Sequence, residues 1–483
     1  MLPFHSRAAA GVSARRARPP AHPHPPRGPA RPLCHVPPRP LARAPPLHLI
    51  HRTASRVFEY QCSGATIEPL GEPAGARGRL PLRAIPAAAA AHFLPKGFPL
   101  SVGADYLPYS LWCALAGVCG SAAGVLSTQS LLYAIGVGHS AALPLAASLN
   151  WVIKDGIGQL AAVASAAVIS DRFDVDPKRW RAVAALSEAG ARCLNASTPF
   201  APWAFLPLAS AANLGYSVAC LAASATKADF HRSLTRQQNL GDLTAKAGSQ
   251  AIVASLAGTA AALLLSSAAV ATPADALVGT VALSAAQLLA IERALQHLAL
   301  PTLTPPAGAA LLRAHLDGAP MPSPSQFAAT QRHVAAPRGL SAANPLPLRL
   351  GSPSLLELVP DPAALCAARS SCAGARHLLT ISACGEVHGV MLDTASPQDV
   401  LLALLHAGLL HEDGVARVDT GRVRATLLDA QRQLPSFVAQ MQQLGWDLSS
   451  ASKLEAVSSR LTIIERLDEG RSRSPPVRLD EQE

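Results

Sequence analysis

Apolar windows separated by short polar stretches fill the middle of the chain. Residues 106–153 contain no Asp, Glu, Lys or Arg, and neither do residues 156–170. A helix needs about 20 apolar residues to cross a bilayer. The windows of that kind are residues 111–138, 143–170, 205–226, 251–271 and 276–298. They predict a mainly α, multi-helix domain that is embedded in a membrane.

Two features of these windows leave a second interpretation open. Many of the apolar residues are alanines, which are weakly hydrophobic and also suit a soluble helical core. The basic stretches near 172–192 and 227–246 flank a single window. One crossing would put them on opposite faces, against the bias of Lys and Arg toward one side of a membrane. Either one window does not span, or part of this domain is soluble. Gly120 and Gly124, four residues apart, are typical of helices that pack closely in lipid.

The C-terminal part of the chain follows a different pattern. Strands are predicted at residues 377–382, 386–392 and 459–465, and amphipathic helices at residues 397–410 and 423–444. Apolar and polar positions alternate over shorter distances here than in the long windows. A small α+β C-terminal domain is therefore expected after the helical one.

Shifts in composition divide the chain into six segments. Proline and alanine mark the connections, and charged residues mark the end. The predicted segments are a leader at 1–58, a lead-in at 59–91, the helical domain at 92–300, a Pro- and Ala-rich linker at 301–360 with one short helix near 309–316, the α+β domain at 361–467 and a disordered tail at 468–483.

The net charge of +10 comes from the start of the chain. Residues 1–58 hold ten Arg and no acidic residue, which is typical of an organelle transit peptide. Prolines interrupt any amphipathic helix there, which favours a plastid over a mitochondrion. A plain disordered tail is the alternative. Without this segment the net charge is about zero (10 − 10), so we expect no nucleic-acid partner.

Lys154 and Asp155 stand together inside the uncharged region. Two such groups in an apolar setting are costly unless they pair, and an ionisable residue inside a bilayer indicates a functional site. The structural alternatives are that Lys154 snorkels to a headgroup and that Asp155 caps a helix starting at Gly156. If the pair is buried, Asp155→Ala is expected to cost about 3–5 kcal/mol.

The charged stretch after these windows contains three acidic residues, Asp171, Asp174 and Asp176. Three carboxylates can hold a divalent cation, but neighbouring Lys and Arg neutralise them and no calcium-loop pattern is present. Asp176 stands directly before Pro177, and Asp at the N-cap with Pro at the first position is a common helix start. The stretch therefore predicts a capped helix.

Familiar catalytic and metal-binding motifs are absent from the sequence. There is no G-x-S-x-G, H-E-x-x-H or P-loop, and the GVG at 136–138 lacks the rest of a nucleotide-binding fingerprint. The nine Cys form no C-x-x-C, and His231 has no second ligand at metal spacing. These patterns favour neither a hydrolase nor a transferase, and they predict no metal site.

Five motifs, in one order, carry a resemblance to a known family. They are LPKGFPLSVGADYLPYSLW, GVG, WVIKDGIG, FDVDPKRWR and NLGDLTAKAGSQ. Over about residues 92–300 the chain resembles the ROOT UV-B SENSITIVE (RUS) family, the DUF647 domain. The resemblance implies a helical, membrane-associated protein, plastid-targeted in several plant members. It also implies a link to root and seedling development under UV-B, to auxin distribution and to vitamin B6 balance.

The resemblance carries over no catalytic residue, because no reaction is established for that domain. Acidic residues that the family usually has after KRWR and after AK are missing here, where Ala182 and Ala247 stand. The polar set left to test is Lys154, Asp155, Lys178, Arg179, Arg181, Asn239, Asp242 and Lys246.

These observations support two functional hypotheses. The first is a non-enzymatic plastid membrane protein that acts as binder, scaffold or transporter, in contact with lipid and with another RUS protein as a candidate partner. The alternative is a soluble or peripheral helical protein that binds a small anionic ligand such as pyridoxal phosphate. Lys154 would then be the Schiff-base amine, although no Gly-rich phosphate cradle accompanies it.

Overall fold

The structure is a computed structural model of the 483-residue chain. It describes residues 47–52, 57–63, 66–69, 92–135, 152–160, 163–164, 173–334, 348–350, 362–381, 387–412, 420–455 and 460–461. The predictions for the GVG at 136–138, for Trp151 and for the tail at 468–483 lie outside these residues.

Three strands near the start form a unit of their own. They are β1 (Leu47–Arg52), β2 (Val57–Ser63) and β3 (Thr66–Pro69), in the order β1-β2-β3. β2 and β3 are antiparallel, with Ser63 opposite Thr66. These strands fall in the ranges predicted to be leader and lead-in, and the transit function of that region stays a prediction.

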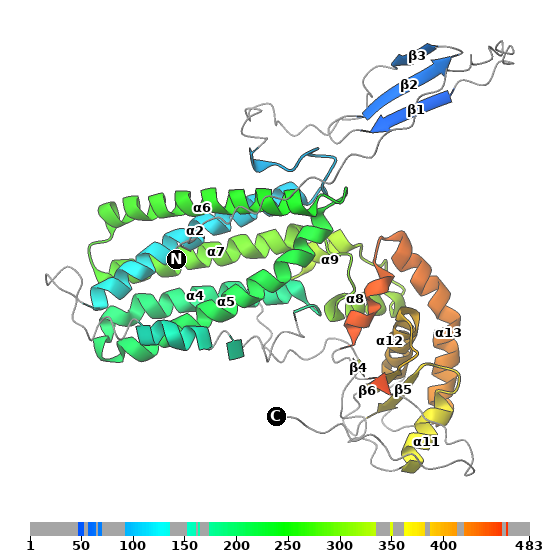
Figure 1. Ribbon diagram of the computed structural model, residues 1–483. Coiled ribbons are helices and arrows are strands. Elements are labelled where there is room, and N and C mark those ends of the chain that lie inside the picture. Colours follow the sequence, from blue (N-terminus) through cyan, green and yellow to red (C-terminus); the bar gives the residue numbers. More distant parts are fainter. Residues whose placement is uncertain are drawn as a thin grey trace, which may run out of the picture. The chain divides into compact units, whose positions relative to one another are not determined.

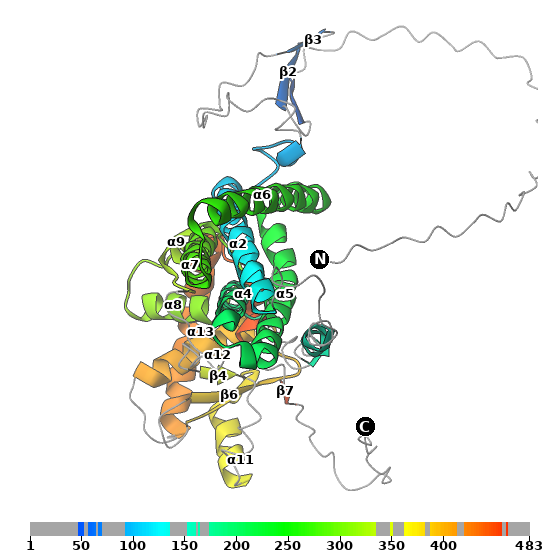
Figure 2. The ribbon, with the colours of Figure 1, turned by 90° about the vertical axis from the view of Figure 1, so that its left-hand side faces the viewer.

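Long helices build the middle of the chain, which confirms the mainly α fold class. In the described residues they are α2 (Tyr106–Ala134), α4 (Pro177–Ser197), α5 (Phe205–Leu234), α6 (Leu240–Ala269) and α7 (Pro273–His297). Helix α2 packs between α6 and α7, and α4 packs between α7 and α5. Figure 1 shows them side by side, and Figure 2 views them closer to end-on.

The ends of these helices follow local sequence rules. The Asp176 carboxylate accepts a hydrogen bond from the backbone N–H of Arg179 at 3.2 Å, and Pro177 opens α4, so the predicted cap is confirmed. Thr272 and Asp275 form a capping box that starts α7. Helix α5 continues eight residues past its predicted end at 226, and α6 starts eleven residues before its predicted start at 251. The predicted end of α5 was wrong because polar side chains do not by themselves stop a helix, whereas the residue at 251 marked only the start of an apolar window.

Small residues let α2 approach its neighbours closely. A Cβ added to Gly258 of α6 would lie 2.3 Å from the backbone oxygen of Val118 in α2, so only glycine fits there. Ser121 and Ser255 form a hydrogen bond across the same pair of helices, with their hydroxyl oxygens 3.0 Å apart. The predicted close packing through small residues is therefore present between α2 and α6.

The C-terminal domain is α+β, as predicted. Strand β6 (Val387–Leu392) pairs antiparallel with β5 (His377–Ile381) on one edge. On its other edge β6 pairs in parallel with β4 (Leu348–Leu350) and then with β7 (Arg460–Leu461). The helices are α11 (Pro362–Ser371), α12 (Pro397–Glu412) and α13 (Thr420–Gln443), followed by the 3-10 helix η5 (Leu448–Leu454).

Part of the predicted linker belongs to this C-terminal core. Helix α8 (Pro305–Leu316) places Ala307, Leu311 and Leu312 among the buried residues of α12 and α13. The short α9 (Pro324–Thr330) follows it, and Phe327 stacks edge-on against Trp446. One apolar face on α8 is enough to draw it into the core, despite the prolines around it.

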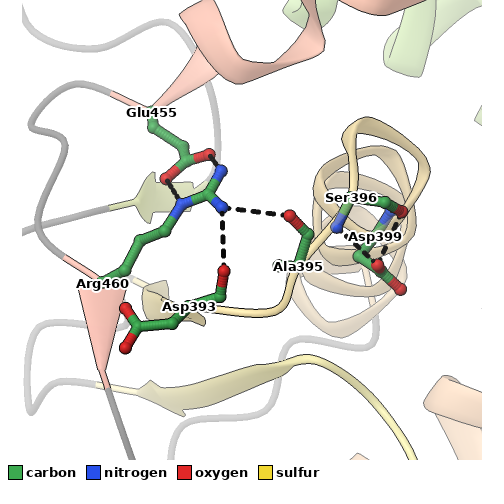
Figure 3. Close-up of polar contacts among 6 residues, drawn as sticks. All are labelled: Asp393, Ala395, Ser396, Asp399, Glu455 and Arg460. Carbon is green, nitrogen blue, oxygen red and sulfur yellow. Dashed lines mark hydrogen bonds and ion pairs between the residues drawn. The ribbon is translucent and has the colours of Figure 1, made fainter.

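Arg460 fastens the final strand to the rest of this domain. Its guanidinium lies against both carboxylate oxygens of Glu455, at 2.9 and 3.4 Å. It also donates to the backbone oxygens of Ala395, at 3.0 Å, and Asp393, at 3.5 Å. Figure 3 shows these contacts converging on one side chain. The Glu455 side chain is nearly buried, so this fork-like pair holds β7 firmly in place.

Candidate functional site

An ion pair with a buried arginine and a half-buried glutamate lies where α2, α4 and α7 meet. Arg192 of α4 is 4% exposed and donates hydrogen bonds to the side-chain oxygens of Glu188, one turn earlier, and of Gln287 in α7. The Gln287 amide donates in turn to the second Glu188 oxygen at 3.0 Å. Ser127 of α2 donates to the backbone oxygen of Arg192 at 3.0 Å. These four residues form the interior polar cluster.

A glycine makes room for this cluster. A Cβ added to Gly120 of α2 would lie 2.9 Å from the Gln287 amide nitrogen and 3.2 Å from a guanidinium nitrogen of Arg192. At Gly124 it would lie 4.0 Å from the Arg192 Nε, which is ordinary contact. The predicted Gly120–Gly124 pair therefore lies against a charged group, and Gly120 is the more constrained of the two positions.

Lys154 and Asp155 form the predicted ion pair. Their Nζ and Oδ1 atoms are 2.6 Å apart, and the two side chains are 6% and 48% exposed. Asn213 of α5 donates to Asp155 Oδ1 at 2.9 Å and to the backbone oxygen of Lys154 at 3.0 Å. Residues 152–160 are helical, so the alternative that Asp155 caps a helix starting at Gly156 is wrong. Snorkelling needs an exposed amine, which this buried Lys154 does not offer.

Lys178 lies buried near the start of α4. It is 5% exposed, and its amine is 3.4 Å from the Gln331 side-chain oxygen. Burial lowers the pKa of Lys178 to about 8, and the carboxylates of Asp176 and Asp105 partly oppose this shift. Lys178 lines a small cavity with Asp176, Thr302, Thr304, Gln331 and Trp446, among others.

The remaining residues of the polar set sit at the starts of two helices. Arg179 and Arg181 are half-buried on the first turns of α4. At the start of α6, Asp242 accepts a hydrogen bond from the backbone N–H of Lys96 at 2.7 Å. Asn239 precedes it, and both of its side-chain polar atoms are buried without a partner in the described part of the chain. Lys246 lies one turn after Asp242, half-buried.

The structure thus divides the predicted polar set among residues 152–160, the start of α4 and the start of α6. It adds the interior polar cluster, of which sequence reasoning had singled out no member. A signal was present: Glu188 and Arg192 stand four apart in an Ala-rich helix, and Gln287 interrupts an apolar window. What the spacing could not show is that these two helices face each other.

Known proteins share this helical region. Residues 81–318 match the family model described as the vitamin B6 photo-protection and homoeostasis domain. Protein root UVB sensitive 6 of Arabidopsis thaliana is 30% identical over 322 residues, which cover 66% of this chain and 62% of that protein. The chain belongs to the root UVB sensitive family. The matched residues take in α2 to α8, so the resemblance that the sequence motifs indicated is confirmed.

Two further root UVB sensitive proteins of Arabidopsis thaliana are similar. Number 3 is 29% identical over 327 residues, 66% of this chain and 74% of that protein. Number 2, named chloroplastic, is 31% identical over 232 residues, 48% of this chain and 53% of that protein. The chain therefore spans less than two thirds of root UVB sensitive proteins 6 and 2. No solved structure matches it.

Proposed function

We propose that this root UVB sensitive protein is a plastid membrane protein of vitamin B6 homeostasis that works as a binder, scaffold or transporter, without catalysing a reaction. The observation that carries the membrane assignment is that the long helices expose large apolar side chains on their outer surface. Large apolar side chains point outward on α6 and α7, among them Leu256, Leu263, Leu264, Val278 and Leu289 at 61–72% exposure. An exposed apolar surface of this extent is stable against lipid and costly in water, which supports the membrane assignment.

The dimensions of the helices support crossing. Among the residues that the structure describes, four stretches are long and apolar enough to span, namely Tyr106–Ala134, Pro202–Leu234, Leu240–Ala269 and Pro273–His297. The shortest has 25 residues, which at about 1.5 Å per residue gives about 37 Å. The hydrocarbon core is about 30 Å thick. Each of these helices can therefore cross a bilayer, with some tilt.

The interior polar cluster is the part of this bundle that we assign to function. A charged pair inside a membrane is retained at an energetic cost, and such pairs mark ligand and ion pathways. The family description names vitamin B6 homoeostasis, and one relative is named chloroplastic. UV-B-linked seedling and root development and auxin distribution belong to the same proposal.

Two measurements test the proposal separately. Alkaline carbonate extraction of plastid membranes should leave the protein in the pellet, and release into the supernatant would end the membrane assignment. Vitamin B6 compounds should then be quantified in cells that lack the protein and carry a variant copy. Arg192→Gln should fail to restore the normal pool, whereas Arg432→Gln, on an exposed ion pair, should restore it. Full restoration by Arg192→Gln would remove the cluster from the function.

A second candidate function is binding of pyridoxal phosphate by a soluble or peripheral form of the protein. The structure offers a different amine from the one the sequence suggested. Lys154 is held by Asp155, whereas the depressed pKa of Lys178, about 8, leaves more of its amine uncharged near neutral pH. The Thr302 hydroxyl in the same cavity is buried without a partner in the described residues. The Lys178 amine would condense with the ligand's aldehyde and release water, and the cavity, with a volume of about 10 Å³, would have to widen to admit the ligand.

Absorbance spectroscopy decides this candidate. Purified protein mixed with pyridoxal phosphate should develop a new band that Lys178→Ala abolishes and Lys154→Ala leaves in place. A band that depends on Lys154 instead would restore the first assignment. If neither variant changes the spectrum, covalent binding at both amines is excluded.

A further inference from the structure

Three metal-binding side chains meet in the core of the C-terminal domain. Cys372 follows α11, His377 opens β5, and His406 lies in the middle of α12. One ligand atom from each lies within 4.8 Å of the other two. The residues are 2%, 0% and 0% exposed, so the cluster lies in the interior, away from the surface where stray ions bind.

Hydrogen bonds fix how the two imidazoles are oriented. His377 Nε2 lies 3.0 Å from His406 Nδ1, and His406 Nε2 lies 2.9 Å from the backbone oxygen of Val423. Because a carbonyl only accepts, His406 Nε2 carries a proton and its Nδ1 offers a lone pair. That lone pair faces His377.

The protein alone does not satisfy this cluster. The second nitrogen of His377, Nδ1, is buried and has no hydrogen-bond partner in the described part of the chain. An orphaned buried polar atom is costly, and native structures usually have a reason for one.

We propose that Cys372, His377 and His406 bind one Zn²⁺ ion. Thiolate and imidazole are the ligands that zinc prefers in proteins. A ligating histidine usually donates its other N–H to a backbone carbonyl, and the His406–Val423 bond supplies this contact. On binding, the Cys372 thiol gives its proton to solvent, and the site then carries a net charge of +1.

The present spacing suits zinc after small side-chain adjustments. With Zn–N distances of about 2.0–2.1 Å and a Zn–S distance of about 2.3 Å, ligand atoms in a tetrahedral site lie about 3.3–3.6 Å apart. His377 Nε2 and His406 Nδ1 are already near this value at 3.0 Å, and zinc bound to both would replace their hydrogen bond, with the His377 proton moving from Nε2 to Nδ1. The ion would join the residue after α11 to β5 and α12, so its role is structural.

Metal analysis of the full-length protein tests the proposal. Dialysis against Zn²⁺ followed by elemental analysis should give one ion per chain. Cys372→Ser and His406→Gln should each weaken binding at least tenfold. Matched controls are Cys366→Ser on α11 and His411→Gln near the end of α12, both exposed, and these should bind zinc as the wild type does. Equal losses in the controls, or no zinc in the wild type, would refute the site.

Cobalt provides a readout that does not depend on a variant folding. Co²⁺ bound by a thiolate gives a near-ultraviolet charge-transfer band, which the wild-type protein should show and which one equivalent of Zn²⁺ should remove. The band must disappear in Cys372→Ser and persist in Cys366→Ser. Binding without a thiolate band would place the ion elsewhere in the chain and overturn the proposal.

Discussion

The helical domain and the C-terminal domain differ in where their large apolar side chains lie. In the helical domain, alanines such as Ala123 and Ala185 are fully buried, while Leu256 and Leu264 are mostly exposed. In the C-terminal domain large side chains such as Leu405 and Phe437 are fully buried, at 0% exposure. Among the described residues, the exposed large apolar side chains lie between 100 and 289, with Leu428 as the exception.

This contrast shows that hydrophobic content alone does not define a core. Small residues let the long helices come close, and the large side chains are then free to face outward. That arrangement is stable where the surroundings are apolar. In the C-terminal domain, burial of large side chains from water supplies the stabilisation. Each prediction below compares matched sites in the two regions.

The largest contrast is expected for large-to-small substitutions. Phe437→Ala should lower the free energy of unfolding of the C-terminal domain by about 3–5 kcal/mol, because it opens a cavity in a closed core. Leu264→Ala, at a site 72% exposed, should change stability by less than about 0.5 kcal/mol in detergent. Denaturant unfolding followed by the fluorescence of buried Trp446 and by helical circular dichroism gives both values. Equal losses at the two sites would contradict the inverted packing.

Breaking the interior polar cluster should cost nearly as much. Glu188→Gln leaves Arg192 buried without its charged partner, at about 3–5 kcal/mol, toward the lower end because Glu188 is 32% exposed. The surface pair of Asp429 and Arg432 is the control, and Asp429→Asn should cost about 0–1 kcal/mol. Unfolding experiments in detergent micelles measure the stability change of each variant. If Glu188→Leu combined with Arg192→Leu were less stable than Glu188→Gln alone, the loss would reflect packing rather than an unpaired charge.

A smaller effect is expected at the Lys154–Asp155 pair. The sequence alone predicted about 3–5 kcal/mol for Asp155→Ala if the pair were buried. Since the Asp155 side chain is 48% exposed, water can partly replace it, and we expect about 1–3 kcal/mol. Asn213→Ala should cost less, because it removes a neutral donor only. If Asp155→Ala left the thermal stability unchanged, the ion pair would contribute nothing to the stability of the fold.

The smallest effects are expected for the capping box, a motif that occurs in both the helical and the C-terminal domain. Ser396 and Asp399 form a capping box at the start of α12, visible in Figure 3, and Thr272 and Asp275 form another at the start of α7. Ser396→Ala and Thr272→Ala should each cost about 1 kcal/mol. If Thr272→Ala alone left the stability nearly unchanged, other groups around the start of α7 would have to accept hydrogen bonds from the N–H groups that Thr272 releases. Thermal unfolding of the two variants gives the comparison.

Local features of the fold were predictable because they depend on neighbours in sequence. Asp176 and Pro177 specify a helix start by their own geometry, and the strands β5 and β6 lie within a residue or two of the predicted ranges. The contribution of α8 to the C-terminal core was not predicted, since proline-rich flanks resemble a linker and only long-range packing overrides them. For the site, pairing of Lys154 with Asp155 was predictable from adjacency, whereas the contact with Asn213, 58 residues away from Asp155, was not.

The sequence by itself determined the mainly α fold, the α+β end, the family and the adjacent charged pair, because periodicity, capping and motif order are local properties. The tertiary structure decided which helices touch. It brought Arg192 to Gln287, 95 residues apart in sequence, and Cys372 to His406, and it turned the leucines of α6 outward. Contacts between distant segments depend on how side-chain volumes fit together in three dimensions, and this information is distributed over the whole chain.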